Sequence, residues 1–145
     1  MKHTMKLFAL FALLLIGVKG NAQDKGIKFF QGTWEEALTE SKNQNKPIFL
    51  DAYASWCGPC KMMAKNTFTK EKAGEYFNAN FINVKMDMEK GEGPALSHKL
   101  GITAYPTLFF IDDKGKVFAK SIGYHTASAL VDIGIQALEL NKKGN

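Results

Sequence analysis

The sequence predicts an α/β protein in which a mixed sheet of about four to five strands carries helices on both faces. Short apolar runs that are typical of strands alternate with helical stretches, and the last two strand-like runs are separated only by a turn. Of the 145 residues, 46% are hydrophobic. A chain of this length and composition can bury the core of one domain.

The individual elements follow from local patterns along the chain. Thr33 and Glu36 have the spacing of a capping box and predict the start of a helix. Pro59 suits the first turn of another helix, where its missing N–H has no cost, and Gly101 is expected to end a third as its C-cap. In order, we expect a candidate edge strand at 27–30, a helix at 33–43, a strand at 47–53, helices from 59 and from 69, a strand at 81–86, a helix at 94–100, a hairpin of strands at 107–111 and 116–121, and a helix at 126–140.

The first 22 residues have the features of a signal peptide. Two lysines precede an unbroken apolar run, residues 7–18, and small residues stand where a signal peptidase would cleave, after Ala22. The run is shorter than the about 20 residues that span a bilayer, although an uncleaved membrane anchor remains the alternative. We therefore expect this segment to be removed, and residues 23–145 to form a single domain in the periplasm or outside the cell.

Charge and composition argue against nucleic acid as a partner. The whole chain has a formal net charge of +5, from 19 lysines and 14 acidic residues. Three of these lysines lie in the predicted signal peptide, so the other 16 leave a net charge of +2. The chain contains no arginine, the residue that most often makes bidentate contacts with phosphates and base edges.

Cys57 and Cys60 are the two cysteines of the chain, and they form a Cys-x-x-Cys pattern at the predicted start of a helix. This spacing brings the two sulfur atoms within reach of a disulfide. Cys57 precedes the first turn, where free backbone N–H groups and the helix dipole stabilise a thiolate and lower its pKa. Cys60 lies one turn further in, where it is expected to be shielded and to resolve a mixed disulfide. A plain structural disulfide and half of a zinc site are the alternatives, but zinc needs about four ligands and the chain has no second cysteine pair.

The segment Trp56-Cys57-Gly58-Pro59-Cys60-Lys61 resembles the active-site signature of the thioredoxin family. The resemblance extends over residues 30–140 and implies a thioredoxin fold. Asp51 falls on the buried aspartate of the family, Tyr105-Pro106 on the segment that bears its cis-proline, and Gly123 on the glycine that completes the substrate groove. It implies a thiol–disulfide oxidoreductase that needs no cofactor besides its own redox-active disulfide.

The same resemblance implies a role for each matching residue. Cys57 and Cys60 are the catalytic pair, and Asp51 relays a proton to or from Cys60, with a pKa that burial should raise. A hydrogen-bonded core carboxylate is the alternative for Asp51. Lys85 stands where the family pairs a lysine with this aspartate, although a solvated lysine at a strand end is the alternative. The expected substrate groove consists of Trp56, Gly58, Pro59, Tyr105, Pro106 and Gly123.

Other segments differ from cytosolic thioredoxins. Residues 88–94 form a longer loop, and the Met62-Met63 pair and residues 67–69 are more similar to exported domains, such as the C-terminal domain of the transmembrane conductor of reducing equivalents. This similarity implies a reductase of disulfides in exported proteins, with a membrane-embedded electron donor. Two alternatives stay open: an oxidase or isomerase of disulfides, and a carrier that holds Cu(I) between the thiols. The methionine pair would suit copper, but helix packing also accounts for it, and we predict no metal site.

Overall fold

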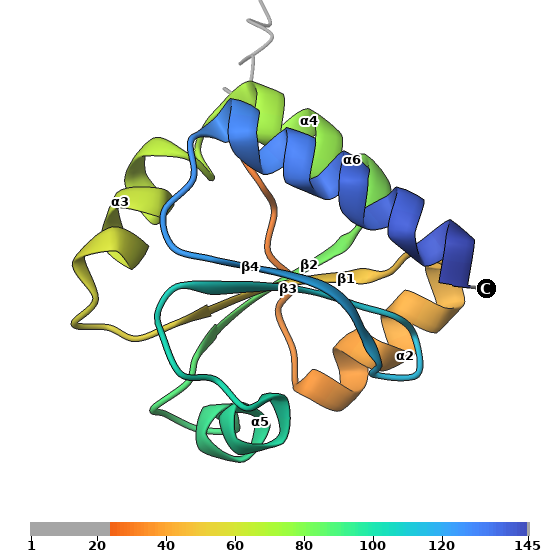
Figure 1. The fold of residues 1–145 in the computed structure, drawn as a ribbon, viewed down its shortest axis with the longest axis horizontal. Coiled ribbons are helices and arrows are strands. Elements are labelled where there is room, and N and C mark those ends of the chain that lie inside the picture. Colours follow the sequence, from red (N-terminus) through yellow and green to blue (C-terminus); the bar gives the residue numbers. More distant parts are fainter. Residues whose placement is uncertain (1–23, 145) are drawn as a thin grey trace, which may run out of the picture.

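The computed structural model describes residues 24–144 and shows a four-stranded mixed sheet with helices on both faces (Figure 1). The predicted fold class is therefore confirmed. The spatial order of the strands is β2-β1-β3-β4, with β1 parallel to β2 and β3 antiparallel to β1 and β4. The strands are β1 (Ile48–Tyr53), β2 (Ile82–Asp87), β3 (Thr107–Ile111) and β4 (Val117–Ile122).

Within residues 24–144, five helices cover the sheet in two layers (Figure 1). One face carries α3 (Gly58–Asn66), α4 (Glu71–Asn80) and α6 (Ala127–Gly144), and the other carries α2 (Trp34–Gln44) and α5 (Gly93–Leu100). The predicted capping box begins α2: Glu36 N–H donates to Thr33 Oγ1, and Thr33 N–H donates to Glu36 Oε2. Gly101 ends α5 in the left-handed conformation, as predicted.

Side chains of β1 alternate between two hydrophobic cores. Phe49 enters a phenylalanine-rich core beneath α3, α4 and α6, which also contains Met63 of α3. Leu50 enters the core beneath α2 and α5. Because successive side chains of a strand point to opposite faces, Asp51 lies on the same face as Phe49, beneath α3.

One predicted strand is absent. Residues 27–30 run beside α4 and β2, but their backbone groups bond to two different segments. Ile27 N–H donates to Phe68 O, and Phe30 N–H donates to Asn83 O, both at 2.7 Å. A ladder needs repeated bonds to one partner strand, so the prediction of an edge strand here was wrong.

The predicted signal peptide, residues 1–22, lies outside the part of the chain that the structure describes. Within the described part, no helix is both long and apolar enough to cross a membrane. Removal of the signal peptide stays a prediction.

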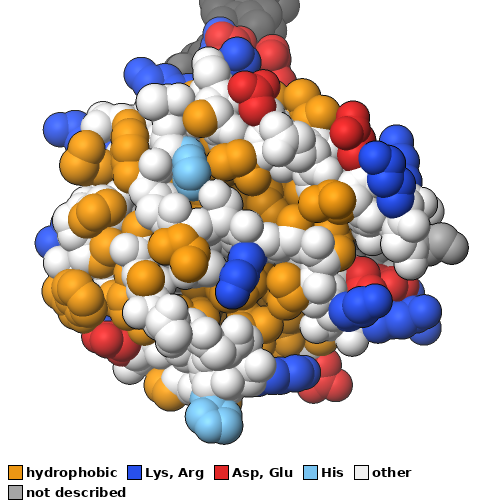
Figure 2. Space-filling model, in the orientation of Figure 1, with side chains coloured by type: hydrophobic (Ala, Val, Ile, Leu, Met, Phe, Trp, Pro, Cys, Tyr) orange, Lys and Arg blue, Asp and Glu red, His pale blue; other side chains and the backbone are white. Residues whose placement is uncertain are grey.

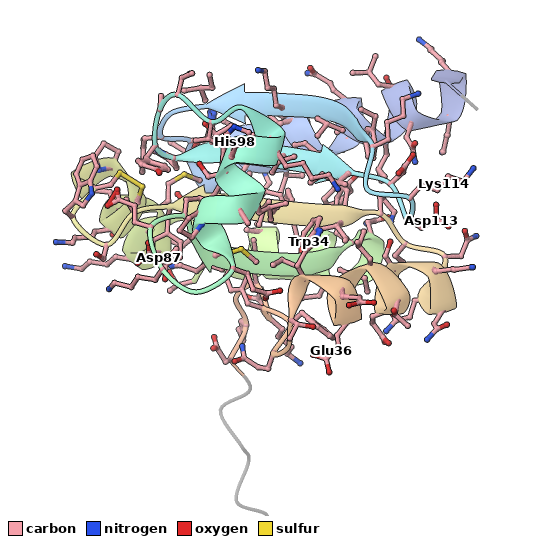
Figure 3. The ribbon with its side chains drawn as sticks, turned by 90° about the horizontal axis from the view of Figure 1, so that it is seen from below. Trp34, Glu36, Asp87, His98, Asp113 and Lys114 are labelled. Atoms are coloured by element: carbon pink, nitrogen blue, oxygen red, sulfur yellow. A yellow bond between two sulfur atoms is a disulfide. The ribbon has the colours of Figure 1, made fainter. Side chains whose placement is uncertain are left out.

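The two ends of the sheet differ in what they carry. Because β1 and β2 are parallel, their carboxyl ends lie at the same end of the molecule, where the loops leading to α3 and α5 begin. Figure 3 shows the disulfide and Asp87, the last residue of β2, at this end, whereas Asp113 and Lys114 of the β3–β4 turn lie at the opposite end. The carboxyl ends of β1 and β2 therefore position the residues that the sequence singled out.

Candidate active site

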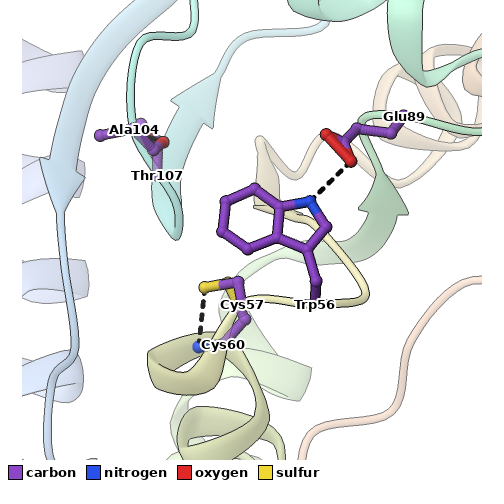
Figure 4. Close-up of a disulfide and its surroundings, with 6 residues drawn as sticks. All are labelled: Trp56, Cys57, Cys60, Glu89, Ala104 and Thr107. Carbon is purple, nitrogen blue, oxygen red and sulfur yellow. Dashed lines mark hydrogen bonds between the residues drawn. A yellow bond between two sulfur atoms is a disulfide. The ribbon is translucent and has the colours of Figure 1, made fainter.

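Cys57 and Cys60 form a disulfide at the N-terminus of α3, with their Cα atoms 5.3 Å apart. Cys57 is the N-cap of the helix, and the backbone N–H of Cys60 donates to Cys57 Sγ at 3.2 Å (Figure 4). This N–H belongs to the first turn, so it has no acceptor within the helix and stays available to a Cys57 thiolate after reduction. The helix N-terminus thus stabilises negative charge on Cys57.

Both cysteines are almost completely buried, with 3% of Cys57 and 4% of Cys60 exposed. They form a small cluster with Ala54, against which the partly buried rings of Tyr53 and Tyr105 pack. We expected Cys60 to be shielded, and Cys57 is shielded to the same extent because this one cluster encloses both sulfurs. The position of Cys57 at the helix N-terminus, and not a difference in exposure, therefore distinguishes the two residues.

Trp56 lies beside the disulfide and is 66% exposed. Its indole N–H donates to Glu89 Oε1 at 2.7 Å (Figure 4). Its ring packs edge-on against Tyr105, with the centroids 5.9 Å apart. A hydrogen bond to a carboxylate is strong enough to orient an exposed ring. Sequence reasoning missed Glu89, although it stands two residues beyond the end of β2, and the carboxyl ends of parallel neighbours meet at one edge of a sheet.

The segment between α5 and β3 meets the end of β4 next to the disulfide. The Tyr105–Pro106 peptide bond is cis, as the resemblance implied. The carbonyl of Pro106, which is buried, accepts a hydrogen bond of 2.9 Å from the N–H of Gly123. Gly123 has a φ of +97°, a conformation that glycine adopts without steric cost. These contacts bring together Pro106 and Gly123, two residues that the resemblance places in the substrate groove.

Apolar side chains are exposed around the disulfide. Figure 2 shows hydrophobic side chains gathered over α3 and the strand ends beside it. Met63 on α3 is fully buried, so helix packing accounts for it, as we expected. Met62 is 49% exposed, so the expectation that it also packs inside was wrong. A contiguous apolar surface is typical of a site that binds other proteins. The exposed residues of this region include Trp56, Gly58, Pro59, Met62, Ile122 and Tyr124.

Asp51 lies buried on the face of β1 that α3 covers, with 1% of its surface exposed. Neither carboxylate oxygen has a hydrogen-bond partner within residues 24–144, so the alternative of a hydrogen-bonded core carboxylate is not met. Burial raises the pKa of Asp51 to about 7, and the positive charge of Lys85 acts in the opposite direction. At neutral pH this carboxyl group can therefore either accept or release a proton.

Lys85 is the register partner of Asp51 across the β1–β2 pair, yet among the described residues it forms no ion pair with Asp51. Its ammonium group lies instead near three aromatic rings. The expected neighbourhood of lysine and aspartate is present, but the expected contact is absent. The alternative of a solvated lysine is not met either, because Lys85 is partly buried. The distances from Nζ to the ring centroids are 4.9 Å for Tyr53, 5.7 Å for Phe68 and 5.9 Å for Phe29.

Metal binding was the other chemistry that the cysteine pair suggested. Among residues 24–144, no group of three or more histidines, cysteines, aspartates or glutamates is placed to hold a metal ion. The described site instead contains a disulfide at a helix N-terminus.

A redox-active pair held in this way places the protein among the thiol–disulfide oxidoreductases. Comparison with known proteins leads to the same class. Residues 29–113 match the family model described as thioredoxin-like, and the chain belongs to the thioredoxin-like family. The resemblance stated from the sequence is thereby confirmed.

Three relatives illustrate the range of the family. A Bacteroides thetaiotaomicron protein of known solution structure, described as a candidate disulphide-isomerase, is 42% identical in sequence. The match covers 81% of this chain and 98% of the Bacteroides chain, and the two structures superpose with a TM-score of 0.71. An H-type thioredoxin of Chlamydomonas reinhardtii is 35% identical over 85 residues, which are 57% of this chain and 69% of the thioredoxin. The thiol:disulfide interchange protein DsbD of Yersinia pestis is 28% identical over 123 residues, which are 76% of this chain but 21% of DsbD.

Proposed function

We propose that this protein reduces disulfide bonds in exported proteins through a dithiol/disulfide cycle of Cys57 and Cys60. The proposal rests on the disulfide at the N-terminus of α3, above the buried carboxyl group of Asp51. Gly58 and Pro59 add no charged group beside Cys57, so the helix N-terminus is the main stabiliser of its thiolate. Moderate stabilisation of the thiolate leaves the disulfide comparatively stable and makes the dithiol an electron donor.

The cycle begins with the reduced protein. The Cys57 thiolate attacks one sulfur of the substrate disulfide, and the other substrate sulfur leaves as a thiolate that takes a proton from water. Asp51 then accepts the proton of the Cys60 thiol. The resulting Cys60 thiolate attacks Cys57 Sγ and releases the second substrate sulfur, which is protonated in turn. Two electrons have passed to the substrate, and the protein has returned to its disulfide form.

Serine substitutions of the two cysteines test the proposal. With dithiothreitol as the electron source, Cys57→Ser should abolish the reduction of insulin, because the remaining Cys60 lies inside the helix and lacks the N-cap position that stabilises a thiolate. Cys60→Ser should attack but not release, so it should accumulate mixed disulfides that are visible on a non-reducing gel. Normal turnover by Cys60→Ser would show that the second cysteine has no resolving role.

Disulfide isomerisation is a second candidate function, because the Bacteroides relative is described as a candidate disulphide-isomerase. Isomerisation transfers no net electrons and needs only an attacking thiolate that later leaves. Cys60→Ser should therefore keep isomerase activity on a scrambled substrate while it loses reductase activity. A reduction potential above that of glutathione, measured by equilibrium titration, would instead support an oxidase.

The proposal also includes a location and an electron source. In an oxidising compartment, a dithiol stays reduced only if a donor regenerates it. We infer a membrane-embedded dithiol donor, and the similarity to part of DsbD supports this inference. N-terminal sequencing of the protein from its native cells should give a start near Gln23. A start at Met1, together with retention in the membrane fraction, would indicate an anchor.

A further inference from the structure

Three aromatic rings lie around the ammonium group of Lys85, and they come from three separate segments. Tyr53 ends β1, Phe68 follows α3, and Phe29 belongs to the N-terminal segment. All three ring centroids lie within about 6 Å of Nζ, the range over which a ring face attracts a cation. Phe29 also packs edge-on against Phe68, with the centroids 5.3 Å apart. We call these three residues the aromatic cage.

The backbone fixes Phe29 in the aromatic cage, although Phe29 belongs to no helix or strand. Hydrogen bonds from the residues on either side of it tie the segment to α4, β2 and the chain after α3. A Cβ on Gly74 of α4 would clash with the Lys25 carbonyl, which shows how closely this segment docks. The bonds run from Ile27 N to Phe68 O (2.7 Å), from Lys28 N to Asn78 Oδ1 (2.8 Å) and from Phe30 N to Asn83 O (2.7 Å).

Lys85 has two other positions within reach of its long side chain. It could donate to Asp51, its register partner, or it could extend into water. A direct ion pair would hold the carboxyl group ionised, whereas a fully solvated ammonium would act on it only weakly, through a high dielectric. In the structure neither occurs, because Lys85 lies against the rings and the oxygens of Asp51 have no partner among the described residues.

We propose that the aromatic cage positions the charge of Lys85 beside Asp51 without a direct contact, and so sets how readily Asp51 takes the Cys60 proton. Phe29, Tyr53, Phe68 and Lys85 are then positioning residues and not catalytic ones. The inference rests on the proposed role of Asp51, but it can be tested without turnover. Within the described part of the chain, the other ionisable groups around Asp51 and Lys85 are the Cys57–Cys60 pair of α3, the phenol of Tyr53 and Asp87 at the end of β2. Asp24 also lies nearby, because it lines a pocket of about 130 Å³ together with Lys85.

The test follows the titration of the Asp51 carboxyl group by NMR in the oxidised protein, in which the two cysteines do not titrate. Phe29→Leu and Phe68→Leu each remove one ring but keep an apolar side chain. With a ring gone, the ammonium group moves toward water and its charge acts less on Asp51. We expect the proton affinity of Asp51 to rise by up to about threefold in each variant, because the change in its interaction with Lys85 cannot exceed the strength of the lost cation–π contact. Lys85→Met should raise it further, because the charge itself is lost.

A comparison of single and double variants shows whether a ring acts on Asp51 by positioning the charge of Lys85 or only by packing in the core. In the Lys85→Met background, Phe29→Leu should leave the Asp51 titration unchanged, because no charge remains for the ring to place. Phe81→Leu is the matched control, since Phe81 is buried in the same core but is not one of the rings near Lys85. Equal shifts in both backgrounds, or no rise in the proton affinity of Asp51 with Phe29→Leu alone, would overturn the inference.

The pH dependence of insulin reduction distinguishes this inference from the proposed function. If the cage acts on catalysis, the midpoint of the rate profile should move with the Asp51 titration in each variant. If the titration moves as expected but the rate profile does not, the cage places the charge as inferred and the proton relay through Asp51 is wrong.

Discussion

The two faces of β1 are packed according to different requirements. Ile48, Leu50 and Ala52 are fully buried in the core beneath α2 and α5, which contains no ionisable side chain among its buried members. On the opposite face, beneath α3, Phe49 is followed two residues later by Asp51, a carboxyl group that is buried with no hydrogen-bond partner among residues 24–144. Burying such a group is costly. One face of the strand therefore provides stability, and the other gives up part of it to bury an ionisable group beneath α3.

We expect the largest effect on stability from a variant that removes the ionisable group from the face beneath α3. Burial raises the pKa of Asp51 from 3.8 to about 7, so between these values the folded protein holds a proton that the unfolded chain has lost. The free energy of unfolding therefore falls as the pH rises through this window, by about 4 kcal/mol in all. Asp51→Asn keeps the shape but cannot ionise, so it should match the parent near pH 4 and exceed its stability by up to about 4 kcal/mol near pH 8.

Urea unfolding of the oxidised protein at the two pH values measures this difference. The same variant should slow the resolution of mixed disulfides, because it cannot accept the Cys60 proton. A stability difference that does not change with pH would contradict the assignment of a raised pKa to Asp51.

The next prediction concerns the face of β1 that lies beneath α2 and α5. Leu50→Ala should lower the free energy of unfolding by about 3 kcal/mol, since it leaves a cavity in a fully buried core. The loss should be equal near pH 4 and near pH 8, because no ionisable group takes part. The reduction potential of the Cys57–Cys60 pair, titrated against glutathione, should not change. A pH-dependent loss would show that the two faces of β1 are coupled.

We expect the smallest effect on stability from a change in the capping box of α2, one of the two helices that cover Leu50. Thr33→Ala removes the side-chain acceptor for the Glu36 N–H and should cost about 1 kcal/mol of stability. Thr33→Ser keeps the hydroxyl group and serves as the control. Thermal unfolding measures both variants, and insulin reduction should proceed at the parental rate. A slower reaction with Thr33→Ala would mean that α2 contributes to the active site.

Features that depend on neighbouring residues could be predicted from the sequence. The capping box of α2, the Gly101 end of α5 and the Cys57–Cys60 pair at the start of α3 are each set by residues within one helical turn. The apolar run around Leu50 likewise predicted β1 to within one residue. The burial of Asp51 was implied by the resemblance to the thioredoxin family, and the structure confirms it.

Features that depend on distant segments could not be predicted in this way. The candidate strand at 27–30 failed because its hydrogen bonds go to Phe68 and Asn83, which no local pattern indicates. Lys85 was expected to contact Asp51, but the competing ring of Phe29 comes from 56 positions earlier in the chain. Such contacts require the fold itself.

The place of Trp56 gives the protein an optical signal of its own oxidation state. An indole ring next to a disulfide is quenched by the sulfur–sulfur bond, and thiols quench it less. The other tryptophan of the chain, Trp34, lies at the start of α2, where its backbone N–H donates to Glu92 Oε2. We expect it to supply a constant background emission. Reduction of the Cys57–Cys60 bond should therefore brighten the fluorescence, so that each electron transfer can be followed in a stopped-flow instrument without a labelled substrate.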